Sequence, residues 1–192
     1  MLRIHNKIIM SLSAISLISA TLLATPAFAN ENEENETVEV KITRSLSAAP
    51  TSITDNATIT DVDGTVLRAG TNSWVCMPGI PLIPGDKHPM CNDAVWMKWI
   101  DAMLNSKPFE TDVLGTSYML AGDALVNNNN PAATDPNDGG MWVQEGPHLM
   151  MILPHASSIA DLPRNPFASG PYVMWDNTPL VHIMVPLGGD IK

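Results

Sequence analysis

The sequence predicts an α+β domain, in which one amphipathic helix packs on a mainly antiparallel sheet of short strands. Short apolar stretches bounded by Gly, Pro and Asn recur along the chain, and most of them follow one another without an intervening helix. A helical repeat of apolar residues occurs in one long segment, at about residues 93–105. The chain has no internal repeat, and its 192 residues fit a single globular domain.

The first 29 residues have the pattern of a secretory signal peptide. Arg3 and Lys7 precede an apolar stretch, and the segment ends in Ala27-x-Ala29, the small-residue pattern at which signal peptidase cleaves. Cleavage before Asn30 would leave 192 − 29 = 163 residues. We therefore expect a periplasmic or secreted bacterial protein with no stable membrane anchor after cleavage.

Residues 30–50 are expected to form a flexible acidic leader that contains a candidate first strand. The stretch NENEENETVE is rich in carboxylates and poor in apolar side chains, which is typical of a solvated segment. In TVEVKIT, Val38, Val40 and Ile42 alternate with polar residues, as in a half-buried strand. The globular domain is then expected to span residues 51–192.

The next elements are predicted from turn residues and alternation. Residues 57–70 indicate a hairpin with Asp63-Gly64 at its turn, where glycine tolerates a positive φ. Residues 72–78 indicate a strand that leads into a loop rich in Pro and Gly. Further strands are predicted at residues 115–124, 141–145, 148–153, 172–175 and 180–185, with one helical turn within residues 155–163.

The predicted helix at residues 93–105 has a clear start, face and end. Asn92 or Asp93 is suited to cap its N-terminus. The apolar side chains recur at positions i, i+3, i+4 and i+7, which makes one stripe that packs on a sheet. Pro108 makes continuation of the helix unfavourable. The stripe consists of Trp96, Trp99, Ile100 and Met103.

The chain has two cysteines, Cys76 and Cys91, and both follow the predicted cleavage site. Exported proteins usually oxidise an even number of cysteines, and two cysteines allow one pairing. We therefore predict a Cys76–Cys91 disulfide that closes a short loop. In the chain-entropy model such a bridge is worth on the order of 3 kcal/mol.

The charge of the chain excludes one class of function. The full chain has 10 basic and 20 acidic residues, and removal of Arg3 and Lys7 changes the net charge from −10 to 8 − 20 = −12. Such a chain is repelled by phosphate backbones and anionic lipids. We therefore expect no nucleic-acid partner, and the sequence leaves any protein partner open.

Several segments resemble those of a group of exported bacterial proteins of unknown activity. The resemblance covers residues 57–188, with the segments in the same order, and it implies a bacterial, exported, single-domain protein. It implies no particular reaction. The matching segments are WVCMPG, MCNDAVWM, SYMLAGDA, QEGPHLMMILP, GPYVMW and HIMVPLG.

Two His-x-Met pairs, His148-x-Met150 and His182-x-Met184, suggest a binding function and not a catalytic one. Side chains two residues apart share one face of a strand, so two neighbouring strands could present all four groups at one point. Imidazole and thioether ligands together favour copper, above all Cu(I). Met174 and Trp175 precede the second pair as auxiliary candidates, since an indole face attracts a cation. Methionine also fills irregular cores, so plain packing explains the same pattern.

Two other functions remain open from the residues alone. A secreted hydrolase could use His148 or His182 with a carboxylate as general base, and the embedded carboxylates are Asp93, Asp123 and Glu145. A partner-binding or carbohydrate-binding module could use exposed tryptophans, for which Trp74, Trp142 and Trp175 are the candidates. No cofactor is certain from the sequence, and copper is the one candidate. A metal ion or a small ligand is a candidate partner.

Overall fold

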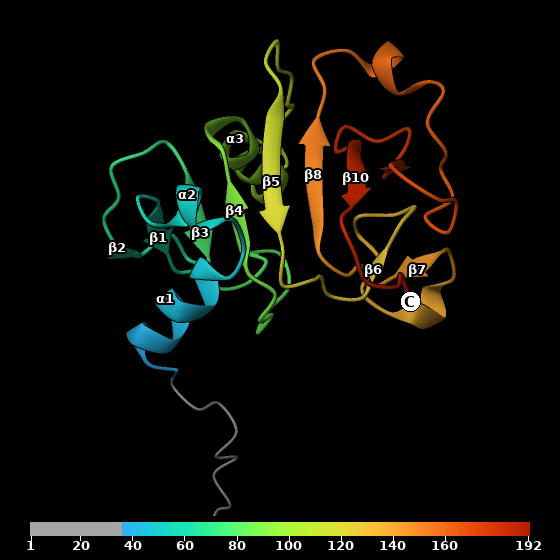
Figure 1. Cartoon of the computed structure of the whole chain (residues 1–192). Helices are drawn as coiled ribbons and strands as arrows, with labels where there is room; N and C mark the ends of the chain where they lie inside the picture. Colours follow the sequence, from blue (N-terminus) through green and yellow to red (C-terminus); the bar gives the residue numbers. More distant parts are fainter. Residues whose placement is uncertain (1–35) are drawn as a thin grey trace, which may run out of the picture. The chain divides into compact units, whose positions relative to one another are not determined.

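A computed structural model describes residues 36–192 of the chain (Figure 1). The predicted signal peptide and the first residues of the predicted leader lie outside the described residues. Residues 36–192 form one compact unit, so the folded domain begins well before residue 51.

An eight-stranded sheet dominates the domain, with strand order β2-β1-β3-β4-β5-β8-β10-β9. All neighbouring pairs are antiparallel except β1 and β3, which confirms the predicted α+β class with a mainly antiparallel sheet. The strands are β1 (Thr58–Thr60), β2 (Val66–Arg68), β3 (Val75–Met77), β4 (Met90–Asn92), β5 (Gly115–Met119), β8 (His148–Ile152), β9 (Tyr172–Met174) and β10 (His182–Pro186). A separate two-stranded sheet pairs β6 (Val126–Asn127) with β7 (Trp142–Val143).

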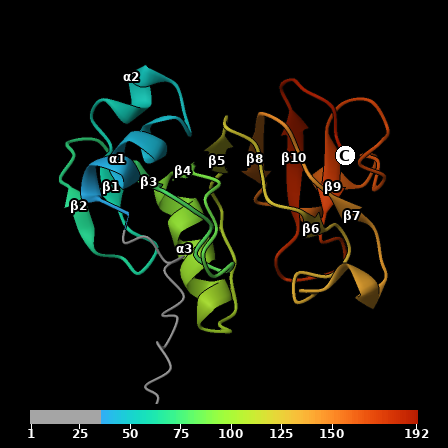
Figure 2. The same ribbon diagram turned by 90° about the horizontal axis from the view of Figure 1, so that it is seen from below.

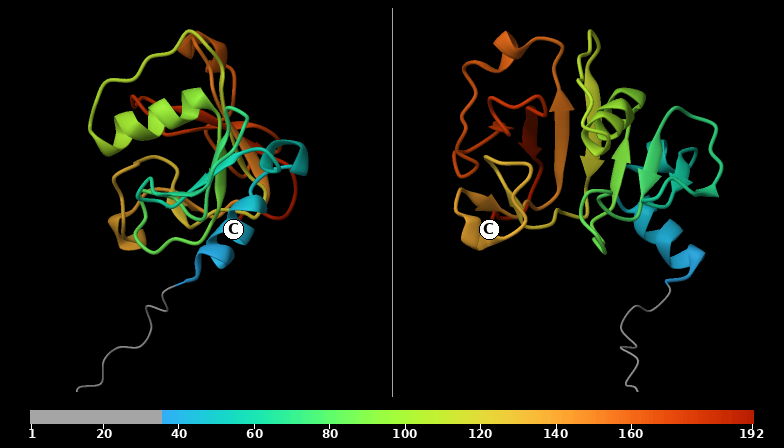
Figure 3. Two further views of the ribbon diagram at one scale, coloured as in Figure 1. Left: turned by 90° about the vertical axis from the view of Figure 1, so that its left-hand side faces the viewer. Right: turned by 180° about the vertical axis from the view of Figure 1, so that it is seen from behind.

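The helices lie on opposite faces of the large sheet. Helix α3 (Ala94–Leu104) covers one face, and α1 (Val38–Leu46) and α2 (Thr51–Thr54) lie on the other (Figure 2). The left view of Figure 3 shows the same arrangement, with α3 (green) on one side of the sheet and α1 (blue) on the other. Two short 3-10 turns, η1 (Pro136–Asp138) and η2 (Ala156–Ile159), complete the elements, and η2 is the predicted helical turn.

Helix α3 is the helix that the sequence predicted. The carboxylate of Asp93 accepts the N–H groups of Val95 and Trp96 and so caps the first turn. The predicted stripe turns inward, because Trp96, Trp99 and Ile100 are buried against the sheet. This burial makes α3 one wall of the main core.

The prediction of a first strand at Val38, Val40 and Ile42 is wrong, because this segment forms helix α1. The Thr37 side chain caps the helix by accepting the N–H of Val40, and Val38 and Val40 are both exposed. The inward side of the helix is instead formed by Ile42, Ser45 and Leu46, which follow at i, i+3 and i+4. Ile42 and Leu46 pack on a core cluster of Ala48, Ala49, Ala57 and Ile59, and this packing favours the helix.

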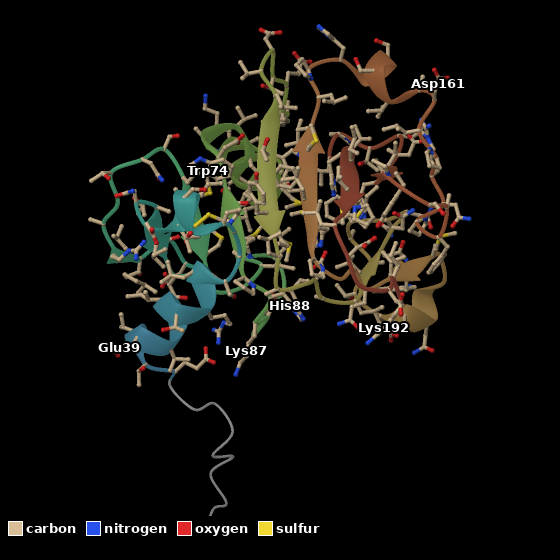
Figure 4. All side chains as sticks on the ribbon, viewed as in Figure 1. Glu39, Trp74, Lys87, His88, Asp161 and Lys192 are labelled. Carbon is tan, nitrogen blue, oxygen red and sulfur yellow. A yellow bond between two sulfur atoms is a disulfide. The ribbon has the colours of Figure 1, made fainter. Side chains whose placement is uncertain are left out.

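The predicted disulfide between Cys76 and Cys91 is present. The two residues lie directly opposite each other on β3 and β4, and both side chains are fully buried. Figure 4 shows the bridge as a yellow bond where these strands run side by side. The bridge closes residues 77–90, which we call the disulfide loop.

In the part of the chain from residue 36 onward, none of the helices has the length and apolar character that crossing a membrane would require.

Candidate functional site

The sheet register decides how the two His-x-Met pairs meet. Strands β8 and β10 are antiparallel neighbours, as the copper hypothesis requires, and Met150 lies directly opposite Met184. His148, however, lies opposite Pro186, and His182 lies four residues away from Pro186 on the same strand. Four strand residues span on the order of 13 Å, so the backbones of the two histidines stand at opposite ends of the methionine pair.

A pocket of about 120 Å³ lies on this face of the sheet, between α3, the disulfide loop and β6. Figure 2 shows α3 and the β6–β7 sheet on the same side of the large sheet. The walls are mostly apolar, and the titratable groups among the lining residues are Asp123 and His182. Three tryptophans and five methionines contribute to the walls: Trp96, Trp99, Trp175, Met90, Met103, Met119, Met150 and Met174.

His182 stands in this pocket surrounded by indole rings. Its ring centroid lies 5.6 Å from that of Trp96, 5.5 Å from that of Trp99 and 5.0 Å from that of Trp175, each in an edge-on arrangement. The Nδ1–H group donates to the carbonyl oxygen of Leu180 at 3.0 Å, so Nε2 is the nitrogen with a free lone pair. Burial lowers the pKa of His182 to about 4. The imidazole is therefore neutral at physiological pH, which is the form that binds metals.

The auxiliary residues named from the sequence lie beside His182. Met174 on β9 is its direct cross-strand partner, and both residues line the pocket. Trp175 follows Met174, and its Nε1–H donates to the carbonyl of Asn127 at 2.8 Å. Together with Met150, these residues place one imidazole, two thioethers and one indole around a common cavity.

His148 has a different environment from His182. It is fully buried, and its Nδ1–H donates to the carbonyl of Gly146 at 2.8 Å. Its Nε2 has no hydrogen-bond partner and lies 3.8 Å from Oδ2 of Asp123. Burial lowers the pKa of His148 and raises that of Asp123 to about 7, because each group loses solvation when charged. Burial therefore favours the neutral form of each group.

Asp93 and Glu145, the other two carboxylates singled out from the sequence, form hydrogen bonds that stabilise the fold. Asp93 caps α3, and the buried Glu145 accepts a hydrogen bond from the Tyr172 hydroxyl at 2.5 Å. Burial raises the pKa of Glu145, and burial and the contact with Glu145 raise that of Tyr172. Tyr172 was not singled out from the sequence, because a tyrosine inside an apolar strand carries no local signal of a carboxylate partner.

The three tryptophans considered for an exposed binding surface are all half-buried. Trp74 packs against Tyr118 with ring centroids 5.7 Å apart, and Trp142 donates its Nε1–H to the carbonyl of Gly139. Trp175 contributes to the pocket wall.

Residues 36–192 contain no group of three or more His, Cys, Asp and Glu side chains placed to hold a metal ion. The pocket instead combines one imidazole with thioethers.

No family model, no curated protein and no solved structure matches this chain.

The disulfide loop forms one rim of the pocket through residues 80–83. Its shape depends on Asp86, whose Oδ2 accepts the N–H groups of Ile80 at 2.8 Å and His88 at 2.9 Å. Gly79 packs so closely here that an added Cβ would lie 2.2 Å from the Asp86 carbonyl oxygen.

We expect Gly79→Ala to lower the free energy of unfolding by about 2 kcal/mol, because backbone must move to accept the methyl group. Chemical denaturation measures the change. Gly188→Ala is the matched control, since a Cβ at Gly188 meets no atom within 4 Å. Equal stability of the two variants would contradict the proposed packing of the rim.

Proposed function

We propose that this chain is an exported bacterial protein that binds a soft monovalent metal ion, Cu(I), in the pocket beneath α3. The observation that carries the proposal is the neutral imidazole of His182 with its Nε2 lone pair free, next to methionines from the adjoining strands. Thioether and imidazole ligands select Cu(I) over harder ions. The periplasm or the extracellular medium is the compartment in which we expect the protein to work.

The proposed ligands are Nε2 of His182 and the sulfur atoms of Met150 and Met174, because these three residues line one cavity. The larger set that also contains His148 and Met184 stays a prediction, but the pocket favours the narrower one. Nε2 of His148 is directed to Asp123, and neither His148 nor Met184 is among the lining residues.

The second candidate function is a hydrolase that uses His148 with Asp123. The 3.8 Å separation of Nε2 and Oδ2 favours it, since a carboxyl group beside an imidazole is suited to proton transfer. His148 is fully buried, however, and the buried Ser117 already donates its hydroxyl to Asn92 at 2.6 Å. This environment is more typical of a structural pair than of a catalytic one.

We expect the purified protein to bind one equivalent of Cu(I), measured anaerobically by competition with a chromogenic chelator. His182→Ala should weaken binding by at least about 100-fold, because loss of an outer partner of a ligand already costs 10–100-fold. His182→Phe, which keeps the ring volume, should behave in the same way. The exposed His155 provides the matched control, and His155→Ala should bind like the wild type.

The affinity should change little between pH 8 and pH 5. Protons compete with the metal for Nε2 only near the pKa of His182, which burial lowers to about 4. If the ligand were an ordinary exposed histidine, the affinity would instead fall steadily as the pH drops below about 6.5. Such a fall, or equal affinities for His182→Ala and the wild type, would show that His182 is not the ligand.

A further inference from the structure

The pocket beneath α3 has the size of one small organic ring. Its volume is about 120 Å³, and apolar cavities of about 150 Å³ bind benzene. Most of the wall is buried, but Leu82 on the disulfide loop is 37% exposed and Trp175 is half-buried, so part of the rim is open to solvent. A small molecule can therefore enter the cavity and fill it.

The wall favours an aromatic ring, because it consists mainly of indole rings and thioethers. Three tryptophans and five methionines line the cavity. Aromatic rings pack favourably edge-on or offset against one another, and a thioether sulfur makes favourable contacts with a ring edge. An apolar ring that enters the cavity also leaves water without giving up hydrogen bonds of its own.

The amide and indole groups in the wall offer no hydrogen bond to a ligand. Asn127 donates its Nδ2–H to one backbone carbonyl, and its Oδ1 accepts two backbone N–H groups. The indole N–H of Trp175 donates to the carbonyl of Asn127. Nε1 of Trp96 and Nε1 of Trp99 are fully buried without a partner, so neither N–H opens into the cavity.

The two titratable side chains in the wall differ in what they present. Oδ1 of Asp123 accepts the N–H of Ala124 at 2.7 Å, and its Oδ2 lies 3.8 Å from Nε2 of His148. His182 donates its Nδ1–H to Leu180, and its Nε2 has no partner and, unlike Nε2 of His148, is not fully buried. Nε2 of His182 is therefore the acceptor that the cavity offers, and it takes one hydrogen-bond donor.

We infer that the pocket binds a small neutral aromatic molecule with one hydroxyl group, for which phenol is the simplest probe. The ring fills the apolar cavity, and the hydroxyl donates to Nε2 of His182. Because this binding depends on the volume, the wall and the free acceptor alone, it does not rest on the proposed function. Cu(I) and phenol should compete, since both need the same lone pair of Nε2.

Isothermal titration calorimetry of the metal-free full protein tests this inference with three ligands. Toluene has the shape of phenol with a methyl group in place of the hydroxyl, and cyclohexanol has the hydroxyl without the aromatic ring. We expect phenol to bind one-to-one and toluene to bind about tenfold more weakly, within the range of one net hydrogen bond. Cyclohexanol should also bind more weakly than phenol, because it loses the aromatic contacts.

Two variants separate the acceptor from the cavity. His182→Phe keeps the ring volume and removes the acceptor, so it should lower the affinity for phenol about tenfold and leave that for toluene unchanged. Ala133→Leu adds bulk to the wall and should weaken both ligands by at least about tenfold. Ala132→Leu is the matched control, because Ala132 is exposed and does not line the pocket.

Near-ultraviolet circular dichroism checks that each variant is folded. If His182→Phe does not fold, the comparison of phenol with toluene in the wild type and the Ala133→Leu variant decide. Equal affinities for phenol and toluene, equal affinities for phenol and cyclohexanol, or simultaneous binding of phenol and Cu(I) overturn this inference. If Cu(I) binds but phenol does not, this inference alone fails, and if phenol binds but Cu(I) does not, the proposed function alone fails.

Discussion

Asp123→Asn is expected to raise the free energy of unfolding by about 4 kcal/mol at pH 8 and by little near pH 4. Burial raises the pKa of Asp123 from its ordinary 3.8 to about 7, so the folded state holds the extra proton between these pH values. The contribution of the protonated Asp123 to the free energy of unfolding is therefore fully present below pH 3.8, and it is lost as the pH rises to about 7. A difference of about three pKa units corresponds to roughly 4 kcal/mol.

The asparagine amide avoids this loss because it has no charge to bury. In the wild type, the N–H of Ala124 donates to Oδ1 of Asp123 at 2.7 Å, and the amide oxygen of an asparagine can accept the same bond. The NH₂ group of the asparagine would face Nε2 of His148, which has no hydrogen-bond partner in the wild type. Urea unfolding of both proteins at a series of pH values gives the difference curve. Asp112→Asn changes an exposed carboxylate and should give a flat curve. A flat curve for Asp123→Asn would mean that its carboxyl group is not buried in the way described.

Replacing both Cys76 and Cys91 by alanine is expected to lower the free energy of unfolding by about 3 kcal/mol. The bridge spans a sequence separation of 15 residues, and cross-linking such a loop restricts the unfolded chain by roughly this amount. Because both side chains are fully buried, the double substitution also removes packing between β3 and β4. Substituting both residues avoids leaving a reactive thiol.

Urea unfolding of the double variant, with and without reductant, checks this expectation. The wild type with reductant should approach the double variant, whereas the double variant should not respond to reductant. The pocket should also bind Cu(I) more weakly, because the disulfide loop contributes residues 80–83 to its wall. A double variant within about 1 kcal/mol of the wild type would show that the loop is held by other contacts.

Local patterns were sufficient for much of the fold. The Asp63-Gly64 turn, where Gly64 has a φ of 88°, joins β1 and β2 as predicted. The Trp96 and Trp99 stripe predicted the buried face of α3, because a helical period is a property of a short stretch of chain. Helix α1 was missed because its sequence fits both periods, and packing of Ile42 and Leu46 on the core selected the helix.

The candidate site depended on information of a longer range. The sequence identified His182, Met174, Trp175 and Met150 as side chains of interest, but not which of them meet. Strands β5 and β8 are neighbours although residues 120–147, which include β6 and β7, lie between them in the chain. Strand β9, and not β8, supplies the cross-strand partner of His182. The pairing register then separates His148 from His182 and brings Met174 beside His182.

By itself, the sequence determined the identity of most elements, the face that α3 buries and the pairing of the two cysteines. Only the tertiary structure decided that His182 lies among Trp96, Trp99 and Trp175, with its Nδ1 bound to Leu180 and its Nε2 free. The reason is physical, since periodicity is set by a few neighbouring residues, whereas strand register and the burial that shifts a pKa come from residues far apart in the chain.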